Sequence, residues 1–285
     1  MNASDPQEDH AAEVARGERF EFGANWARFL NALNEDRIAL AEQSLRTMMC
    51  VNDLQGRRFL DVGSGSGLFS LAARRLRATV HSFDYDSQSV ACTAELKRRY
   101  YDLDPDWRVE QGSVLDAEYM ARLGQFDVVY AWGVLHHTGN MWQALELVVP
   151  RVKPGGTLFI ALYNDQGRAS VVWRKVKQTY NRAPKFLRVI ILGLAFLRLW
   201  GPSILRDLLR GRPFTTWKKY QGASRGMSPW RDVVDWVGGY PFEVAKPEEV
   251  FRFFRDRGFG LRELVTCAGG LGCNEFVFER RVSGA

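Results

Sequence analysis

The sequence predicts an α/β fold in which a doubly wound, mostly parallel sheet carries a helical cap insertion. Two observations support this prediction: short apolar runs alternate with helix-compatible stretches, and the first run passes directly into a glycine-rich turn. The composition agrees, because 46% hydrophobic and 25% charged residues in a chain of 285 are typical of a soluble globular protein with a sizeable core. A fibrous or wholly disordered chain is excluded.

The first residues, 1–18, are polar and lack an apolar core, so they are expected to form a flexible tail rather than a signal peptide. A cytoplasmic location follows as the default. Residues 20–49 have the pattern of an amphipathic helical region, which opens with Phe20, Phe22 and Trp26.

The apolar runs that follow are expected to be the strands of the sheet. They lie at residues 57–63, 78–84, 126–133 and 155–163, with a final antiparallel pair at residues 261–270 and 273–281. Helices are expected between them, for example at residues 68–76 and 87–100. A further helix at residues 247–257 begins with Pro and two Glu, which favour a helix start.

The glycine-rich turn has the pattern GxGxG, at Gly63, Gly65 and Gly67. A phosphate-binding P-loop requires GxxxxGK[ST], and a dinucleotide fingerprint requires GxGxxG, whose last position is Leu68 here; neither motif fits. Asp61 stands just before the glycines, and Asp84 ends the next predicted strand, where a carboxylate can accept both hydroxyls of a ribose. The pattern therefore favours a nucleoside site at the carboxyl ends of the strands.

With these residues in place, residues 57–156 resemble the class I S-adenosylmethionine-dependent methyltransferases. The resemblance implies a seven-stranded Rossmann-like methyltransferase fold and S-adenosyl-L-methionine as the cofactor. It implies that the glycine loop passes the methionine part and that Asp84 holds the ribose. Around the adenine the family often carries Asp where this chain has Ser113, so that contact falls to Ser113, the Val114 backbone or Asp116. The cofactor-binding residues expected from the resemblance are Asp61, Gly63, Gly65, Gly67, Asp84, Tyr85, Ser113, Val114 and Trp132.

The stretch "FDVVYAWGVLHHTGNMWQAL" resembles small-molecule methyltransferases, including the ubiquinone-pathway O-methyltransferases, and would place Trp132, His136 and His137 beside the sulfonium. Alignment and desolvation can supply most of the catalysis of methyl transfer. A hydroxyl acceptor must still lose its proton, and an imidazole suits that role. Neighbouring side chains on a helix point in different directions, so at most one of the two histidines faces the acceptor. The alternatives are hydrogen-bonded structural roles for both, with any proton passing to water, Tyr163 or Asp165.

The predicted function is therefore methyl transfer to a small-molecule acceptor, at a hydroxyl oxygen, with transfer to N, S or C of a small molecule as an alternative. Enzymes of the family often cover the site with an N-terminal helical segment. The residues expected to contact the acceptor are Trp26, Tyr163, Tyr240 and Phe242, for which packing roles are the alternative.

The basic charge of the chain is concentrated in one segment. Residues 166–225 hold 14 of the 39 Lys and Arg residues but one of the 33 acids, Asp207, which makes this segment +13 and the rest of the chain −7. The apolar run at residues 189–197 is too short to span a bilayer, which favours a helical cap over the site. Its basic face could attract an anionic substrate or an anionic membrane surface, or could simply be solvated. A nucleic-acid methyltransferase is the second hypothesis because of this charge, but a separate RNA-binding module and an Asn-Pro-Pro-Tyr-like motif are both missing.

These patterns divide the chain into four parts. They are a flexible tail (1–18), an N-terminal helical lid with the cofactor-binding core (19–165), a basic helical cap insertion (166–240) and the C-terminal part of the core sheet (241–285). The four cysteines are Cys50, Cys92, Cys267 and Cys273; without a CxxC pair or nearby histidine ligands they indicate neither a metal site nor a disulfide framework.

Overall fold

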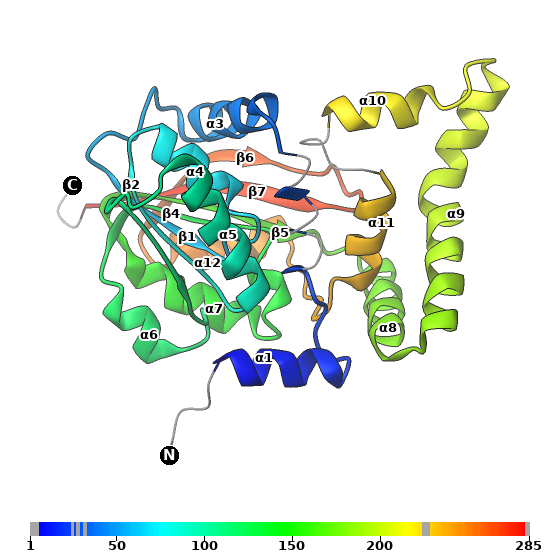
Figure 1. The fold of residues 1–285 in the computed structure, drawn as a ribbon, viewed down its shortest axis with the longest axis horizontal. Coiled ribbons are helices and arrows are strands. Elements are labelled where there is room, and N and C mark those ends of the chain that lie inside the picture. The colour runs from blue at the N-terminus through cyan, green and yellow to red at the C-terminus, as the bar shows by residue number, and fades with distance from the viewer. Residues whose placement is uncertain (1–5, 24–25, 27–28, 31–32, 224–228, 283–285) are drawn as a thin grey trace.

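A computed structural model of the chain describes residues 6–23, 26, 29–30, 33–223 and 229–282 (Figure 1). Within them, seven strands form one sheet in the order β3-β2-β1-β4-β5-β7-β6. The strands are β1 (Arg58–Val62), β2 (Thr79–Asp84), β3 (Trp107–Gln111), β4 (Phe126–Trp132), β5 (Val152–Tyr163), β6 (Phe259–Val265) and β7 (Cys273–Arg280).

Neighbouring strands among β1 to β5 are parallel, and β7 runs antiparallel to both β5 and β6. The predicted mostly parallel, doubly wound seven-stranded sheet is thereby confirmed. The strand order reverses between β1 and β4, and ligands bind at such a switch point. The apolar runs did not indicate β3, because it is an edge strand with one fully buried residue, Trp107, and four partly or fully exposed ones.

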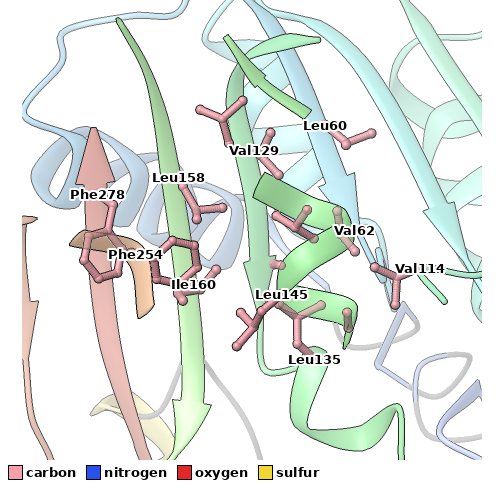
Figure 2. Close-up of a cluster of buried hydrophobic side chains, with 14 of the residues drawn as sticks. Leu60, Val62, Val114, Val129, Leu135, Leu145, Leu158, Ile160, Phe254 and Phe278 are labelled. Atoms are coloured by element: carbon pink, nitrogen blue, oxygen red, sulfur yellow. The ribbon is translucent and has the colours of Figure 1, made fainter. Parts of the chain in front are cut away.

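Helices cover both faces of the sheet. Phe59 points to one face, where it joins residues of α3, α4 and α5, and the next residue, Leu60, points to the other, where it joins residues of α6, α7 and α12. Figure 2 shows the second cluster, in which Leu158 and Ile160 of β5 lie near Phe254 and Phe278. The covering helices are α3 (Glu35–Met49), α4 (Leu68–Arg75), α5 (Ser87–Tyr100), α6 (Ala117–Arg122), α7 (Met141–Val148) and α12 (Pro247–Arg255), with short 3-10 turns η1 (Leu135–His137) and η2 (Val149–Arg151).

The chain begins with a helix rather than the flexible tail predicted for residues 1–18. Helix α1 (Pro6–Ala15) packs on the core through His10, whose side chain is buried and whose ring lies edge-on to Tyr85, with 5.3 Å between the ring centroids. The prediction is therefore wrong for the helix, and residues 1–5 lie outside the described residues. In the predicted helical region 20–49, α3 begins where the Asn34 side chain accepts a hydrogen bond from Arg37 N at 3.1 Å, and residues 24–25, 27–28 and 31–32 are not described.

Four helices follow β5 and lie to one side of the sheet (Figure 1). They are α8 (Arg168–Arg182), α9 (Lys185–Leu209), α10 (Thr215–Ala223) and α11 (Pro229–Gly238). They share a small apolar cluster around Trp200, Val233 and Val237. The apolar run at residues 189–197 is part of the 25-residue helix α9, which, within the described part of the chain, is long and apolar enough to cross a bilayer, although one or two such helices are weak evidence of a span.

Candidate active site

A cavity of about 1060 Å³ lies at the carboxyl ends of the parallel strands. Asp61, Asp84, Trp132 and Tyr163, at or near the ends of β1, β2, β4 and β5, all line it. Its other walls come from the N-terminal segment and from α10 and α11. This is the position at which open α/β sheets bind their ligands.

Most of the residues predicted for the site surround this cavity. They are Trp26, Asp61, Gly63, Gly65, Asp84, Tyr85, Ser113, Val114, Trp132, His136, His137 and Tyr163. Gly67, Tyr240 and Phe242 do not line it.

The glycine loop leaves no room for side chains. Gly63 has φ 73°, and a Cβ there would lie 2.4 Å from a methyl group of Val134. Gly67 precedes α4 with φ 79°, and a Cβ there would lie 2.9 Å from the Thr93 Cα. Gly67 therefore allows close packing of α4 on α5, while Gly63 and Gly65 expose backbone to the cavity.

Two carboxyl groups face the cavity beside this loop: Asp61 is buried and Asp84 is partly buried. Asp84 accepts hydrogen bonds from Gly65 N at 2.9 Å and from Asp86 N at 3.0 Å, yet burial raises its pKa to about 6. Asp61 accepts from Ser70 Oγ at 2.5 Å, and burial raises its pKa to about 7. Ligand hydroxyls or a positive charge placed here would favour the ionised forms of both groups.

The wall expected to face the adenine is formed by the loop after β3. The Ser113 side chain accepts from Leu115 N at 3.2 Å, and the Asp116 side chain accepts from Tyr119 N at 3.0 Å, where it begins α6. Each side chain accepts a hydrogen bond within a local turn, but the Ser113 hydroxyl can still donate and the second Asp116 oxygen can still accept, and both residues line the cavity together with Val114 and Tyr85.

The N-terminal segment is fastened over the cavity by polar contacts. Arg19 donates to the backbone oxygens of His137 at 2.8 Å and Thr138 at 3.4 Å, and its guanidinium lies 5.0 Å from the Tyr85 ring centroid. Gly23 N donates to Asp86 Oδ2 at 2.8 Å. The sequence predicted the aromatic residues of this segment but missed Arg19, for which there was no signal. It also missed Asp86, whose only signal was its place as a helix N-cap.

His136 lines the cavity beside Tyr163. It is 1% exposed, its ring centroid is 3.9 Å from that of Tyr163, and its Nδ1 is buried with no hydrogen-bond partner among the described residues. A hydrogen bond to the Ala161 backbone involves the ring, and since Nδ1 has no partner, Nε2–H is the donor. Burial lowers the His136 pKa well below its usual value, so the ring is neutral and carries its lone pair on Nδ1.

His137 has a different environment. Its Nδ1 donates to the Pro241 backbone oxygen at 2.7 Å, and burial lowers its pKa to about 3. The same loop is fixed to the N-terminal segment by a bond from Phe20 N to the Tyr240 oxygen at 2.8 Å. Phe242 packs behind Tyr163, with 5.2 Å between ring centroids. Tyr240 and Phe242 therefore support the cavity wall from behind instead of contacting its interior.

Lys177 of α8 is buried against α11 and Phe242. Its ammonium donates to the Trp236 backbone oxygen and lies 4.3 Å from the Trp236 ring centroid and 4.6 Å from that of Phe242. Burial lowers its pKa to about 7. The sequence grouped Lys177 with the other basic residues of the insertion, and no local pattern distinguishes it from them.

The cysteines are free thiols, and Cys267 and Cys273 line the cavity. A search of the described residues finds no group of three or more His, Cys, Asp or Glu side chains that could hold a metal ion.

Known proteins are similar to this chain in sequence or in fold. A family model described as a methyltransferase domain matches residues 60–158. The ubiquinone biosynthesis O-methyltransferase of Xanthomonas campestris pv. campestris is 30% identical over 189 residues, which cover 63% of this chain and 70% of that protein. That of Brucella ovis is 29% identical over 181 residues, 61% of this chain and 64% of that protein, so the chain spans less than two thirds of the latter's length.

Two solved structures have the same fold. The magnesium protoporphyrin IX methyltransferase of Synechocystis PCC 6803 is 14% identical with a TM-score of 0.52, covering 94% of this chain and 99% of that one. The 1,6-didemethyltoxoflavin-N1-methyltransferase of Burkholderia thailandensis is 13% identical with a TM-score of 0.51, covering 99% and 93%. Both structures contain S-adenosylhomocysteine. With this fold, a GxGxG loop and an acidic residue ending β2, the chain belongs to the class I S-adenosylmethionine-dependent methyltransferases.

Proposed function

We propose that the protein transfers a methyl group from S-adenosylmethionine to a hydroxyl oxygen of a small-molecule acceptor. The observation that carries this proposal is that one cavity holds both the Asp84 carboxyl group beside the glycine loop and the neutral His136 ring beside Tyr163. The names of the curated relatives, which are O-methyltransferases, support oxygen as the atom methylated.

The residues present fit the cofactor. The bare loop at Gly63 and Gly65 lets a ligand approach the backbone, and the Asp84 carboxylate, with about four lone-pair sites, can still accept from a ribose in addition to its backbone donors. When bound, S-adenosylmethionine supplies an electrophilic methyl group. The volume of about 1060 Å³ leaves space for an acceptor as well.

We assign the acceptance of the hydroxyl proton to Nδ1 of His136. The bond from Nε2–H to the Ala161 backbone fixes the tautomer, and the Nδ1 lone pair has no partner within the described residues. Because Nδ1 is buried, this role requires that the bound acceptor displace the side chains that cover it. Because burial lowers the pKa of this ring, His136 is a weak base. It therefore suits a hydroxyl that is already acidic, such as a phenol or an enol, better than an aliphatic alcohol. Most of the rate would then come from alignment and from exclusion of water beneath the N-terminal segment.

A labelled-methyl experiment tests the proposal. The purified protein is incubated with methyl-labelled S-adenosylmethionine and a panel of phenols, aliphatic alcohols, amines and thiols, and the products are identified by mass spectrometry. We expect label on phenolic oxygen, and loss of labelling with Asp84→Ala. Label on nitrogen or sulfur alone would contradict the oxygen assignment, and a failure to bind S-adenosylmethionine in calorimetry would contradict the whole proposal.

A further inference from the structure

Helix α9 presents a continuous apolar stripe to solvent. The residues of the stripe recur every three or four positions, and Gly201 divides the one longer interval, between Leu197 and Leu205. They therefore lie on one face of the helix. Six of them are between 53% and 71% exposed: Phe186, Ile190, Leu194, Leu197, Leu205 and Leu208. Single exposed leucines are ordinary, but a row of them along a helix of about 37 Å marks an interaction surface.

The stripe is not the face through which α9 packs on the rest of the protein. The opposite face of α9 is packed already, with Ala195 and Trp200 buried and the Trp200 ring centroid 5.1 Å from that of Trp217 on α10. Helices α8 and α11 also contact α9 along its inner side (Figure 1). Rotating the stripe inward would therefore expose Ala195 and Trp200, which are now buried.

The surroundings of the stripe are basic. Lys185, Arg198 and Arg212 are exposed near its beginning, middle and end. Asp207, the one acidic residue of segment 166–225, is 6% exposed and accepts hydrogen bonds from Thr216 N at 2.7 Å and Thr216 Oγ1 at 2.8 Å. The solvent-facing side of α9 therefore presents cations and apolar side chains.

We infer that α9 docks, lying in the plane of the membrane, on an anionic lipid bilayer. Apolar side chains flanked by Lys and Arg match the acyl chains and the phosphate headgroups of such a surface. A nucleic acid would pair with the cations but would leave the row of leucines in water. A spanning position does not fit, because α8, which packs on α9, carries the charged side chains of Arg174 and Lys175 and would have to enter the bilayer with it.

Docking would bring the bilayer next to the cavity wall. Tyr220 of α10 and Trp236 of α11 line the cavity, and both belong to the apolar cluster that packs against the inner face of α9. Only the thickness of these cap helices would separate bound lipid from the space proposed for the acceptor.

Flotation of the full-length protein with vesicles tests the inference. We expect it to float with phosphatidylcholine vesicles that contain phosphatidylglycerol, far less with pure phosphatidylcholine, and to be released by high salt. The pair Leu194→Glu with Leu197→Glu should weaken binding on the order of 100-fold or more, through lost apolar burial and added repulsion. The triple change Lys185→Gln, Arg198→Gln and Arg212→Gln should weaken it on the order of 100-fold as well.

The matched control is the pair Leu40→Glu with Leu103→Glu, which alters two exposed leucines outside the cap and changes the net charge equally. It should bind vesicles as the wild type does, and all variants should keep the wild-type affinity for S-adenosylhomocysteine, which shows that they are folded. Failure of the wild type to bind anionic vesicles, or an equal loss in the control, would overturn the inference. So would ultracentrifugation showing a dimer that the Leu194 and Leu197 changes dissociate, or membrane binding that resists salt and alkaline carbonate.

Discussion

Arg19 and His137 are 118 positions apart in the chain, and a hydrogen bond of 2.8 Å from the Arg19 guanidinium to the His137 backbone oxygen joins them. The same guanidinium is paired with Glu13 at 2.6 Å and lies over Tyr85. One side chain therefore connects helix α1, the aromatic residue expected beside the adenine, and the 3-10 turn with both candidate histidines. The N-terminal segment and this turn are therefore joined through Arg19.

Replacing Arg19 with Ala should loosen this cover. We expect the affinity for S-adenosylhomocysteine to fall about tenfold, as is typical when charge-assisted hydrogen bonds are lost, and the N-terminal segment to become more sensitive to protease. Calorimetry and limited proteolysis measure the two effects. Arg16→Ala is the matched control, because Arg16 pairs with the exposed Glu18 at 2.8 Å and such surface pairs contribute little. Equal effects from both changes would show that Arg19 does not act through its contacts.

Replacing Asp84 with Ala should remove the acceptor for the ribose hydroxyls. Hydrogen bonds to a charged group contribute about 1.5–3 kcal/mol each, so affinity for both S-adenosylmethionine and S-adenosylhomocysteine should fall on the order of tenfold or more. Asp84→Asn should lose less, since an amide oxygen still accepts. A folded Asp84→Ala variant with unchanged affinity would show that the ribose is held elsewhere.

Cofactor binding should release protons near neutral pH. Burial raises the pKa values of Asp61 to about 7 and Asp84 to about 6, so in the free protein both carboxyl groups are partly protonated there. A cationic ligand that donates hydrogen bonds favours the ionised forms, lowers both pKa values and expels protons. Affinity should therefore rise as the pH rises through 6 and 7.

Calorimetry in two buffers of different ionisation enthalpy counts the protons released. S-Adenosylhomocysteine, which lacks the sulfonium charge, should release fewer than S-adenosylmethionine, and Asp61→Asn should lower the count for both. Proton uptake, or an affinity that is flat between these pH values, would contradict this electrostatic description of the site.

Lys177 should make the stability of the protein depend on pH. Its folded pKa, lowered to about 7 by burial, lies below the value of 10.5 expected in the unfolded chain. Between these values the unfolded chain binds more protons, so the free energy of unfolding should increase as the pH rises from 7 toward 10.5. Lys177→Met removes the titration, so melting curves should show this variant gaining stability over the wild type at low pH and losing that advantage at high pH. Lys175→Met, on the same helix, is the control.

The local features of this fold were predictable, and the contacts between distant segments were not. Apolar runs ending at Asp61 and Asp84 indicated strands, and the GxGxG spacing indicated the loop, because each depends on neighbouring residues. Strand β3 lies at the edge of the sheet and has one fully buried residue, so its sequence did not form an apolar run. Arg19 and Lys177 look like ordinary surface cations in the sequence, and their burial depends on segments far away in the chain. Residues 6–15 were predicted to be part of a tail because their sequence is polar. In the structure they form helix α1, which contacts Tyr85 and Asp86 through His10, and these partners lie far away in the chain.

The two histidines should respond differently to substitution. His136→Gln can keep the donor to the Ala161 backbone while removing the Nδ1 lone pair, so turnover of a phenolic acceptor should fall roughly 10²–10⁴-fold with cofactor affinity nearly intact. His137→Gln interrupts the bond to the Pro241 oxygen, and we expect it to lower the melting temperature and raise KM for every acceptor. Steady-state kinetics, calorimetry and melting curves distinguish these outcomes.

An acceptor that is already ionised provides the sharpest version of this test. If Nδ1 of His136 takes the hydroxyl proton, its loss should matter less as the pKa of a series of substituted phenols falls, because the most acidic ones lose their proton to water before they bind. The ratio of wild-type to His136→Gln turnover should therefore decline with acceptor pKa, while the ratio for His137→Gln stays constant. A constant ratio for both variants would remove His136 as the base and leave alignment and desolvation as the source of the rate, with the proton passing to water, Tyr163 or Asp165.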